Sequence, residues 1–421
     1  MSTVTRTPLT SVAIIGLGYV GLPTALALHG RCQRVIGIDI SQHRLETIHS
    51  GKADLNDADK ATLAAAVADG TFEMTTRMDD MREADAVIIC VPTPVTGDNV
   101  PDLGPVQAAC ESAVTLARPG QTLILTSTTY VGTTSELLTG PLERRGMKVG
   151  TDVFVAFSPE RIDPGVPEHH HRATPRVVGG TSARCTAEAM RVLSQITDSV
   201  HPVSSPEAAE ATKLYENVQR AVVLALANEF ADACRVLDLN PMEVTSAAAT
   251  KPYSFLPVRP GPGVGGHCIP VDPHYLLWQL RQHDHESPLI RQAMKQIGAR
   301  PEQVAARARE VLDGQLAGKK IIIAGVAYKP GVQDLRESPA IALTERLASA
   351  GADVSYHDPL IPAMRLAGRP GLTSTPDPRG EDYDLVIVHT MHPGVRYGWV
   401  NSCAQVLDAT YQFSGEPACT L

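Results

Sequence analysis

One glycine-rich stretch with a single cysteine is where side chains of this 421-residue chain could do covalent chemistry. It reads G-P-G-V-G-G-H-C-I-P-V-D-P from Gly261 to Pro273, with Cys268 at the end of the glycine run and Asp272 four residues later. Glycine lets a ligand approach closely, and a cysteine outside a cluster of branched apolar residues is typical of a nucleophile. The alternative is a tight turn with an incidental thiol, and the loop alone favours neither.

A second candidate site follows the first expected strand, residues 12–15. Three glycines in the pattern G-x-G-x-x-G lead from this strand into an expected helix, and they are Gly16, Gly18 and Gly21. They permit a tight turn and let a pyrophosphate approach the start of the helix. The next expected strand, residues 34–38, ends at Asp39, where an acid would bind the ribose hydroxyls of adenosine. A carboxylate repels a 2′-phosphate, so the pattern favours NAD over NADP, although Arg44 lies nearby. A turn that serves packing alone is the weaker alternative.

Polar side chains follow three further expected strands, which are residues 86–91, 123–126 and 153–157. Thr93, Thr128 and Glu160 come shortly after these strands. Ligands of a doubly wound sheet gather at the carboxyl ends of its strands, so these side chains are expected where cofactor and substrate meet. The alternative is hydroxyls that cap strand ends, with an ordinary surface glutamate.

Residues 206–237 have apolar side chains at three- and four-residue spacing, which predicts a helix of about thirty residues. Its length would let it join two domains and form a dimer surface. Lys213, Asn217 and Arg220 lie on one face of this helix. A solvated polar stripe is the default interpretation, and the absence of an acid among them also suits an anionic ligand.

Another helical region is expected over residues 274–312, and a second, smaller α/β unit begins with the strand at 321–325. Lys329 and Arg336 follow that strand and could hold a second phosphate-bearing ligand. The predicted fold class is α/β, with two Rossmann-like doubly wound domains joined by a long central helix and a small helical domain. The expected domains are an NAD-binding domain (1–203), a central helical dimerisation domain with the cysteine loop (204–314) and a second Rossmann-like domain for the other phosphate-bearing ligand (315–421).

Composition excludes several classes of protein. Apolar residues make up 43% of the chain, which is enough for globular packing, and the net charge of −9 gives no basic face for nucleic acid. Eight cysteines without CxxC pairs, no signal peptide and no long apolar run predict a cytoplasmic protein without membrane contact. The histidines at 169–171 are expected to be solvated, and no metal site is predicted.

Seven motifs, in order along nearly the whole chain, resemble those of the nucleotide-sugar 6-dehydrogenases, the family of UDP-glucose and UDP-N-acetylhexosamine dehydrogenases. They read G-L-G-Y-V-G-L-P, V-P-T-P with P-D-L, S-T-T-Y-V-G-T-T, S-P-E-R-I-D-P-G, K-L-Y-E-N, G-P-G-V-G-G-H-C-I-P-V-D-P and G-V-A-Y-K-P with D-L-R-E-S-P-A. Seven ordered motifs are far more specific than any single one. The resemblance implies a four-electron oxidation of the sugar C6 alcohol to a carboxylate, with two NAD.

The resemblance also implies roles for individual residues. Cys268 would attack the C6 aldehyde to give a thiohemiacetal, which a second hydride transfer converts to a thioester that water hydrolyses. Lys213 would handle protons and stabilise the oxyanion together with Asn217, and Glu160 would serve the acid–base step. The residues that position water and the lysine would be Thr128 and Asp272.

Ligand contacts are implied by position in the same way. Together with the three glycines, the expected NAD contacts are Tyr19, Val20, Asp39, Arg44, Thr93, Thr128 and Arg336. The expected UDP-sugar contacts are Glu160, Arg161, Ile162, Lys213, Asn217, Arg220, Gly265, Tyr328 and Lys329. The enzyme is expected to be a homodimer built across the long helix.

The forms S-P-E-R and G-G-H-C-I-P-V-D-P resemble the N-acetylhexosamine branch, which favours UDP-GlcNAc or UDP-ManNAc over UDP-glucose. A non-catalytic dinucleotide-binding scaffold is the alternative from another class. A two-electron dehydrogenase of a small hydroxy acid is a further alternative. Both leave Cys268 without a task.

Three positions depart from the family pattern. The run Asp408-Ala409-Thr410 stands where the family often has D-T-R, and Thr126 replaces a frequent glutamate. Ile297 lies near the place of an asparagine that usually precedes a Met-Pro pair, where this chain has Arg300-Pro301. The first departure could alter phosphate recognition and leaves room for an unusual substrate.

Overall fold

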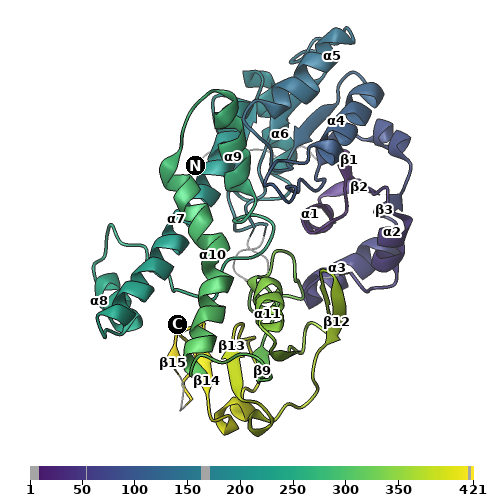
Figure 1. The fold of residues 1–421 in the computed structure, drawn as a ribbon. Coiled ribbons are helices and arrows are strands. Elements are labelled where there is room, and N and C mark those ends of the chain that lie inside the picture. The colour runs from purple at the N-terminus through teal and green to yellow at the C-terminus, as the bar shows by residue number, and fades with distance from the viewer. Residues whose placement is uncertain (1–8, 54, 163–170, 416–418) are drawn as a thin grey trace. The chain divides into compact units, whose positions relative to one another are not determined.

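The boundary between two units of the chain falls inside one long helix. The computed structural model describes residues 9–53, 55–162, 171–415 and 419–421. The first unit contains the described residues up to Glu216 together with His274–His283, and the second contains Asn217–Pro273 and the described residues from Asp284 onward. The helix that passes from one unit to the other is α7, Pro206–Val236 (Figure 1).

An eight-stranded sheet forms the centre of the first unit, in the order β3-β2-β1-β4-β5-β6-β7-β8 (Figure 1). Its strands are β1 Leu9–Ile15, β2 Cys32–Ile38, β3 Phe72–Thr75, β4 Ala86–Ile89, β5 Thr122–Leu125, β6 Phe154–Phe157, β7 Arg176–Gly180 and β8 Val200–Pro202. Neighbouring strands are parallel except β6 and β7. The central strands are short apolar runs buried throughout, as parallel strands covered on both faces require.

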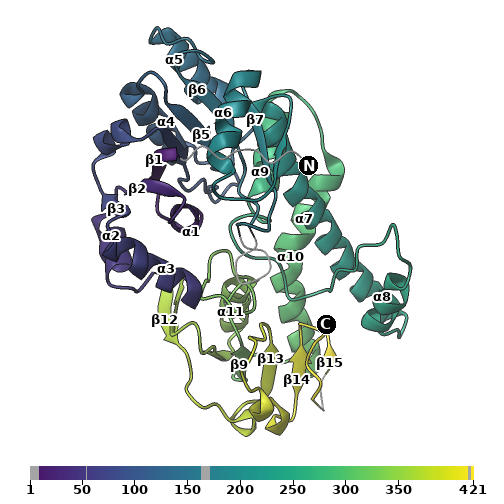
Figure 2. The ribbon, with the colours of Figure 1, turned by 180° about the vertical axis from the view of Figure 1, so that it is seen from behind.

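Helices cover both faces of this sheet (Figure 2). On one face lie α1 Gly21–Ala27, α2 Gln42–His49, α3 Asp57–Ala68 and α6 Ala183–Leu193, whose apolar side chains share a core with β1 and β2. On the other lie α4 Gly104–Leu116, α5 Gly140–Arg144 and the short helical turns Met78–Glu83 and Ser135–Thr139. The sheet is therefore doubly wound, and its strand ends are positioned by packing on both sides.

The second unit contains a smaller parallel sheet in the order β10-β9-β13-β14-β15. Its strands are β9 Lys320–Ala324, β10 Asp353–His357, β13 Leu385–Val388, β14 Val406–Asp408 and β15 Cys419–Thr420. The other elements of this unit are α8 Pro241–Ala249, α10 Pro288–Val311, α11 Pro339–Ser349, the hairpin of β11 Ala363–Leu366 and β12 Arg369–Thr373, and the short turns Gly380–Asp382 and Gly398–Ser402. The order β10-β9-β13 repeats the order β2-β1-β4 of the first unit.

The predicted fold class, two Rossmann-like sheets and a long central helix, is confirmed. The helical region expected over 274–312 consists of two helices, α9, Asp272–Gln282, and then α10. Asp284 takes a left-handed conformation with φ of +52° and Pro288 opens the second helix, so the first cannot continue. The proposed domain boundaries remain predictions. Among the helices in the described ranges, none has both the length and the apolar character of a membrane span.

Candidate active site

The glycine loop after β1 is closely packed at two of its three glycines and open at the third. A Cβ at Gly16, whose φ is +89°, would lie 2.6 Å from the Cys90 carbonyl oxygen, and a Cβ at Gly21 would lie 1.8 Å from the Gly16 carbonyl oxygen. A Cβ at Gly18 would meet no heavy atom within 4 Å. Gly16 and Gly21 are therefore required by the fold, whereas Gly18 leaves room beside the loop for a ligand.

Asp39 and Arg44 both hold the backbone of this loop. Asp39 Oδ2 accepts a hydrogen bond from the Leu17 N–H at 2.9 Å, and Oδ1 accepts from the Ser41 N–H at 2.9 Å. Arg44 Nε donates to the Leu17 carbonyl at 2.8 Å. Asp39 remains partly exposed at the end of β2, so its carboxylate fits the ribose hydroxyls of an adenosine. The open side of Gly18 and this carboxylate together fit NAD.

Glu160 is a buried carboxylate three residues beyond β6, with 7% of its surface exposed. Oε2 forms an ion pair with the buried Arg176, and Oε1 accepts from the N–H groups of Arg161 at 2.8 Å and Ile162 at 3.1 Å. Burial alone would raise the pKa of Glu160, but the charge of Arg176 and these hydrogen bonds outweigh it and hold the pKa below its ordinary value. Glu160 is thus kept ionised and suits a base better than an acid.

His171 belongs to this cluster, and the prediction of a solvated histidine run is wrong for it. Its Nδ1 lies 3.1 Å from an Nη atom of Arg176 and 3.8 Å from Glu160 Oε2, and only 11% of its side chain is exposed. The residues at 169 and 170 lie outside the described residues. The sequence does not show that His171 contacts Arg176, because the position of Arg176 depends on the fold. Among the described residues, no cluster of His, Cys, Asp and Glu could hold a metal.

Lys213 and Arg161 lie beside Glu160 in the first unit. Lys213 Nζ donates to the Glu160 carbonyl at 2.9 Å. Arg161 pairs with Glu216 of α7 at 2.5 Å and donates to the Pro175 carbonyl at 2.9 Å. Glu216 was not among the predicted site residues, although it is part of the K-L-Y-E-N motif.

In the second unit, the cysteine loop is joined to α7 through Asp272. Asp272 is 1% exposed, and its Oδ2 accepts a hydrogen bond from Asn217 Nδ2. The N–H of Asp272 donates to the Cys268 carbonyl at 2.8 Å, so Cys268 closes the turn that opens α9. Cys268 is partly exposed, whereas Asn217 is buried and does not belong to a solvated stripe. Arg220, three residues further along α7, is exposed.

The glycines before Cys268 pack against the loop that follows β9. A Cβ at Gly265 would lie 2.6 Å from the Tyr328 Cβ, and the N–H of Gly266 donates to the Arg336 carbonyl at 2.9 Å. Arg336 in turn pairs with Asp334 at 2.7 Å. Of the expected ligand contacts, Gly265, Tyr328 and Arg336 are therefore gathered in one place, and Lys329 follows Tyr328 directly.

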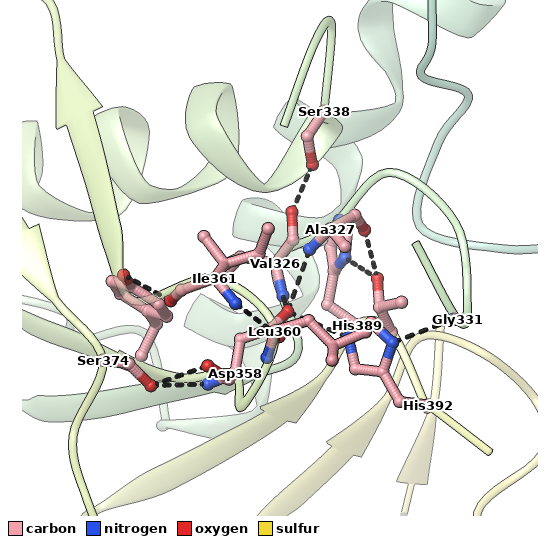
Figure 3. Close-up of polar contacts among 12 residues, drawn as sticks. Val326, Ala327, Gly331, Ser338, Asp358, Leu360, Ile361, Ser374, His389 and His392 are labelled. Atoms are coloured by element: carbon pink, nitrogen blue, oxygen red, sulfur yellow. Dashed lines mark hydrogen bonds and ion pairs between the residues drawn. The ribbon is translucent and has the colours of Figure 1, made fainter. Parts of the chain in front are cut away.

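The loop after β9 is held by Asp358, which sequence analysis gave no role (Figure 3). Its Oδ2 accepts from the N–H groups of Val326 at 2.7 Å and Ala327 at 3.1 Å, and His392 Nε2 lies 3.0 Å away. The N–H of Gly331 donates to His392 Nδ1 at 3.0 Å, so the ring proton lies on Nε2 and points to Asp358. Burial would raise the pKa of Asp358, but His392 and the backbone donors lower it overall.

Four further expected site residues lie, as predicted, in the loops that follow strands of the first sheet. Tyr19 and Val20 belong to the glycine loop, Thr93 follows β4 and Thr128 follows β5, and all four are partly buried. Thr410, at the departure from D-T-R, donates its N–H and its hydroxyl to Asp408 at 2.8 and 2.7 Å. This position caps a turn and supplies no cation.

Three family models match the chain in order along its length. Residues 10–197 match the NAD binding domain of the UDP-glucose/GDP-mannose dehydrogenase family, residues 207–296 its central domain and residues 322–417 its UDP binding domain. The chain belongs to this family. It is an oxidoreductase, an NAD-dependent dehydrogenase of nucleotide sugars.

Individual relatives of the dehydrogenase carry names from one branch of that family. It is 36% identical to the UDP-N-acetyl-D-mannosamine dehydrogenase of Escherichia coli (strain K12), over 80% of this chain and 82% of that protein. It is 33% identical to the UDP-N-acetyl-D-glucosamine 6-dehydrogenase of Pseudomonas aeruginosa, over 90% of each chain. The solved structure of the UDP-D-ManNAc dehydrogenase from Pyrococcus horikoshii superposes with a TM-score of 0.87 at 28% identity, covering 98% of both chains.

Proposed function

We propose that this dehydrogenase oxidises the C6 hydroxyl of a UDP-N-acetylhexosamine to a carboxylate through a covalent intermediate on Cys268. The observation that carries the proposal is the buried hydrogen bond between Asn217 and Asp272, formed beside the turn that Cys268 closes. A turn with an incidental thiol needs no buried carboxylate and amide next to it. The names of the relatives, and the S-P-E-R and G-G-H-C forms, support the sugar class.

Each residue has a task in this reaction. The oxidant would be NAD, with one molecule supplying the hydride acceptor for each of the two oxidations. The Cys268 thiolate adds to the carbonyl carbon of the C6 aldehyde, a C–S bond forms, and the carbonyl electron pair moves to oxygen to give a thiohemiacetal. Loss of a second hydride leaves a thioester, and addition of water breaks the C–S bond and releases the thiol. The alcohol thus loses four electrons as two hydrides and gains one oxygen atom from water.

Proton transfer and charge stabilisation are assigned to Glu160, Lys213 and Asn217. Glu160, kept ionised by Arg176, takes a proton from the hydrolytic water. Lys213 and Asn217, one turn apart on α7, stabilise the negative oxygen that forms when the thiolate or water adds. Thr128 and Asp272 position water and the lysine. The proposed UDP-sugar contacts are Arg161, Ile162, Arg220, Gly265, Tyr328 and Lys329.

NAD recognition is assigned to Asp39 and the glycine loop, with further contacts proposed by position in the family pattern. Asp39 binds the adenosine ribose, and Gly18 admits the pyrophosphate. The other proposed contacts are Gly16, Tyr19, Val20, Gly21, Arg44, Thr93, Thr128 and Arg336.

A panel of substrates tests the proposal. Purified protein with NAD is given UDP-GlcNAc, UDP-ManNAc, UDP-glucose and UDP-galactose in parallel, and products are identified by mass spectrometry. A product with one more oxygen and two fewer hydrogens from an N-acetylhexosamine supports the proposal. That product from UDP-glucose alone would refute the sugar class, and tight NAD binding without turnover of any sugar would favour the scaffold.

We also infer a homodimer formed across α7. Tyr215, Leu226 and Leu237 are 72%, 63% and 67% exposed and follow one another at eleven-residue steps, which is about three helical turns, so they share a face. Phe230, one turn after Leu226 and also exposed, lies between Leu226 and Leu237. Large exposed apolar side chains in a row mark an interaction surface. Light scattering of Leu226→Glu should give a monomer, and an unchanged dimer would contradict the α7 surface.

A further inference from the structure

Both peptide groups of Gly261, at the start of the cysteine loop, are held by buried polar side chains. Its N–H donates to Asn228 Oδ1 at 2.8 Å, and its carbonyl accepts from Arg300 Nε at 3.0 Å. Asn228 comes from α7 and Arg300 from α10, so the backbone of this one residue is held between two helices. Neither side chain was among the predicted site residues.

Arg300 is itself fixed by an ion pair. Its Nη1 donates to both carboxylate oxygens of Asp232, at 2.8 and 2.8 Å, and to Gln303 Oε1 at 3.0 Å. The Arg300 side chain is 1% exposed, whereas that of Asp232 is 34% exposed, so the carboxylate faces water and the guanidinium does not. The direction of Nε toward Gly261 is therefore set by Asp232.

Asn228 and Asn217 place the two ends of the cysteine loop on one face of α7. They are eleven residues apart, about three helical turns, so their side chains point to the same side of the helix, about 16 Å apart along its axis. Asn228 binds Gly261 at the start of the loop, and Asn217 binds Asp272 at its end. Asp232 continues this face one turn further on.

Between these ends the loop has little conformational preference of its own. Gly263 and Gly266 have φ of +143° and +80°, values that glycine adopts readily but that nothing in the local sequence enforces. A Cβ at Gly263 would lie 2.7 Å from Pro339 and 3.8 Å from the Arg300 Cβ, so Arg300 also packs against the middle of the loop. The position of Cys268 thus depends on the anchors.

We propose that Arg300, oriented by Asp232, is a positioning residue that sets the geometry of the cysteine loop and, through it, of the Cys268 thiol. The inference rests on the proposed function, in which Cys268 is the nucleophile. Arg300 also lies close in the chain to one departure from the family pattern. Ile297 is apolar and buried near the place of an expected asparagine, and Arg300 supplies polar contacts from within the next turn of α10.

A double variant separates positioning from folding. Removing Asp232 alone would leave a buried guanidinium without its partner, which is strongly destabilising, whereas removing both charges leaves no buried charge unpaired. Asp232→Leu/Arg300→Met should therefore melt close to the wild type while losing the hydrogen bond to Gly261. Val304→Ala, one turn after Arg300 at a fully buried site, is the control for a general loss of stability.

The labelling rate of the Cys268 thiol is a measurement that a merely structural role of Arg300 would not change. Cys268 and Cys419 are partly exposed and the other six cysteines are buried, so iodoacetamide labelling of Cys268 can be compared with that of Cys419 in the same sample by mass spectrometry. The double variant should change the labelling rate of Cys268 several-fold and lower kcat by about tenfold to a hundredfold. The KM for NAD and the labelling of Cys419 should not change. Arg300→Lys, which keeps one donor, should recover part of kcat.

Each result bears on the inference. Wild-type kcat and wild-type Cys268 labelling in the double variant would overturn it, and so would an equal loss of kcat in Val304→Ala. A wild-type enzyme that stays fully active after Cys268 is labelled would instead overturn the proposed function on which the inference rests. Labelling that abolishes wild-type activity, together with unchanged behaviour of the double variant, would remove the role of Arg300 alone.

Discussion

Asp39 and Asp358 stand at the same place in their two sheets but use their carboxylates differently. Each follows the strand beside the first strand of its sheet, and each accepts a hydrogen bond from the backbone of the loop after that first strand. Asp39 remains partly exposed, whereas Asp358 is 1% exposed and is also bonded by His392. The first carboxylate can therefore meet a ribose, and the second only fixes a loop. The same architecture thus leaves a partly exposed carboxylate in the first sheet and buries the corresponding carboxylate in the second.

Asp358→Ala should destabilise the second unit. It leaves four backbone N–H groups, those of Val326, Ala327, Leu360 and Ile361, and also His392 without their side-chain acceptor. At about 1–3 kcal/mol for each buried group left unpaired, roughly 3 kcal/mol or more is expected in urea unfolding. The control is Asp353→Asn, at an exposed site on β10, the strand that Asp358 follows. It should change stability by less than about 0.5 kcal/mol. Because the loop carries Tyr328 and Lys329, the KM for the UDP-sugar should rise. Equal stability of both variants would contradict the role of Asp358.

The pH dependence of this stabilisation has a defined sign. The pKa of Asp358 is lower in the folded protein than its ordinary value of 3.8, so the folded state binds the proton less readily than the unfolded chain. The stabilisation is complete above pH 3.8 and is lost as the pH falls below it. The difference in unfolding free energy between wild type and Asp358→Ala should therefore shrink in acid. A constant difference from neutral pH to well below 3.8 would contradict the assignment.

Arg176→Met should create an acid limb in the pH profile of kcat. Without the guanidinium, burial is opposed only by weaker contacts, so the pKa of Glu160 should rise and the carboxylate should protonate at higher pH. The wild type keeps Glu160 ionised throughout the neutral range. Arg172→Met is the matched control, because Arg172 pairs with the exposed Asp198 at 3.6 Å. A pH profile of Arg176→Met without a new acid limb would show that Glu160 is not the base.

Gly18→Ala and Gly21→Ala should have different effects. A methyl group at Gly21 would overlap the Gly16 carbonyl oxygen and should unfold the loop, with a lower melting temperature even without NAD. A methyl group at Gly18 meets no protein atom within 4 Å, so the melting temperature should hold while NAD affinity falls by about tenfold or more. Thermal unfolding with and without NAD separates the two. Wild-type NAD affinity in Gly18→Ala would contradict the assigned pyrophosphate position.

Local pattern was enough to predict the glycine loop and the central strands of both sheets, but not the outer strands β3, β7, β8, β14 and β15. Apolar runs bounded by glycine and proline identified β1, β4 and β9, and the spacing from Gly21 to Asp39 located a carboxylate that does bind the loop. The break between α9 and α10 was missed, although Ser287-Pro288 is a typical helix start. The helical spacing of apolar residues on both sides of this position was given more weight than that signal.

The side chains that hold the site could not be predicted, because their partners are distant in the chain. Asp358 and His392 are 34 residues apart, and Arg300 and Asp232 are 68 apart. Charged residues are ordinarily exposed, so pattern alone assigns them to the surface. Only the packing of α10 on α7 makes Arg300 a buried donor.

The central claim is tested most directly by counting NADH formed per sugar consumed, for the wild type and for Cys268→Ser. We predict two NADH per sugar with a uronic acid as product for the wild type, and no normal acid production by the variant. One NADH per sugar with an aldehyde as product, or normal acid production by Cys268→Ser, would contradict the covalent four-electron mechanism.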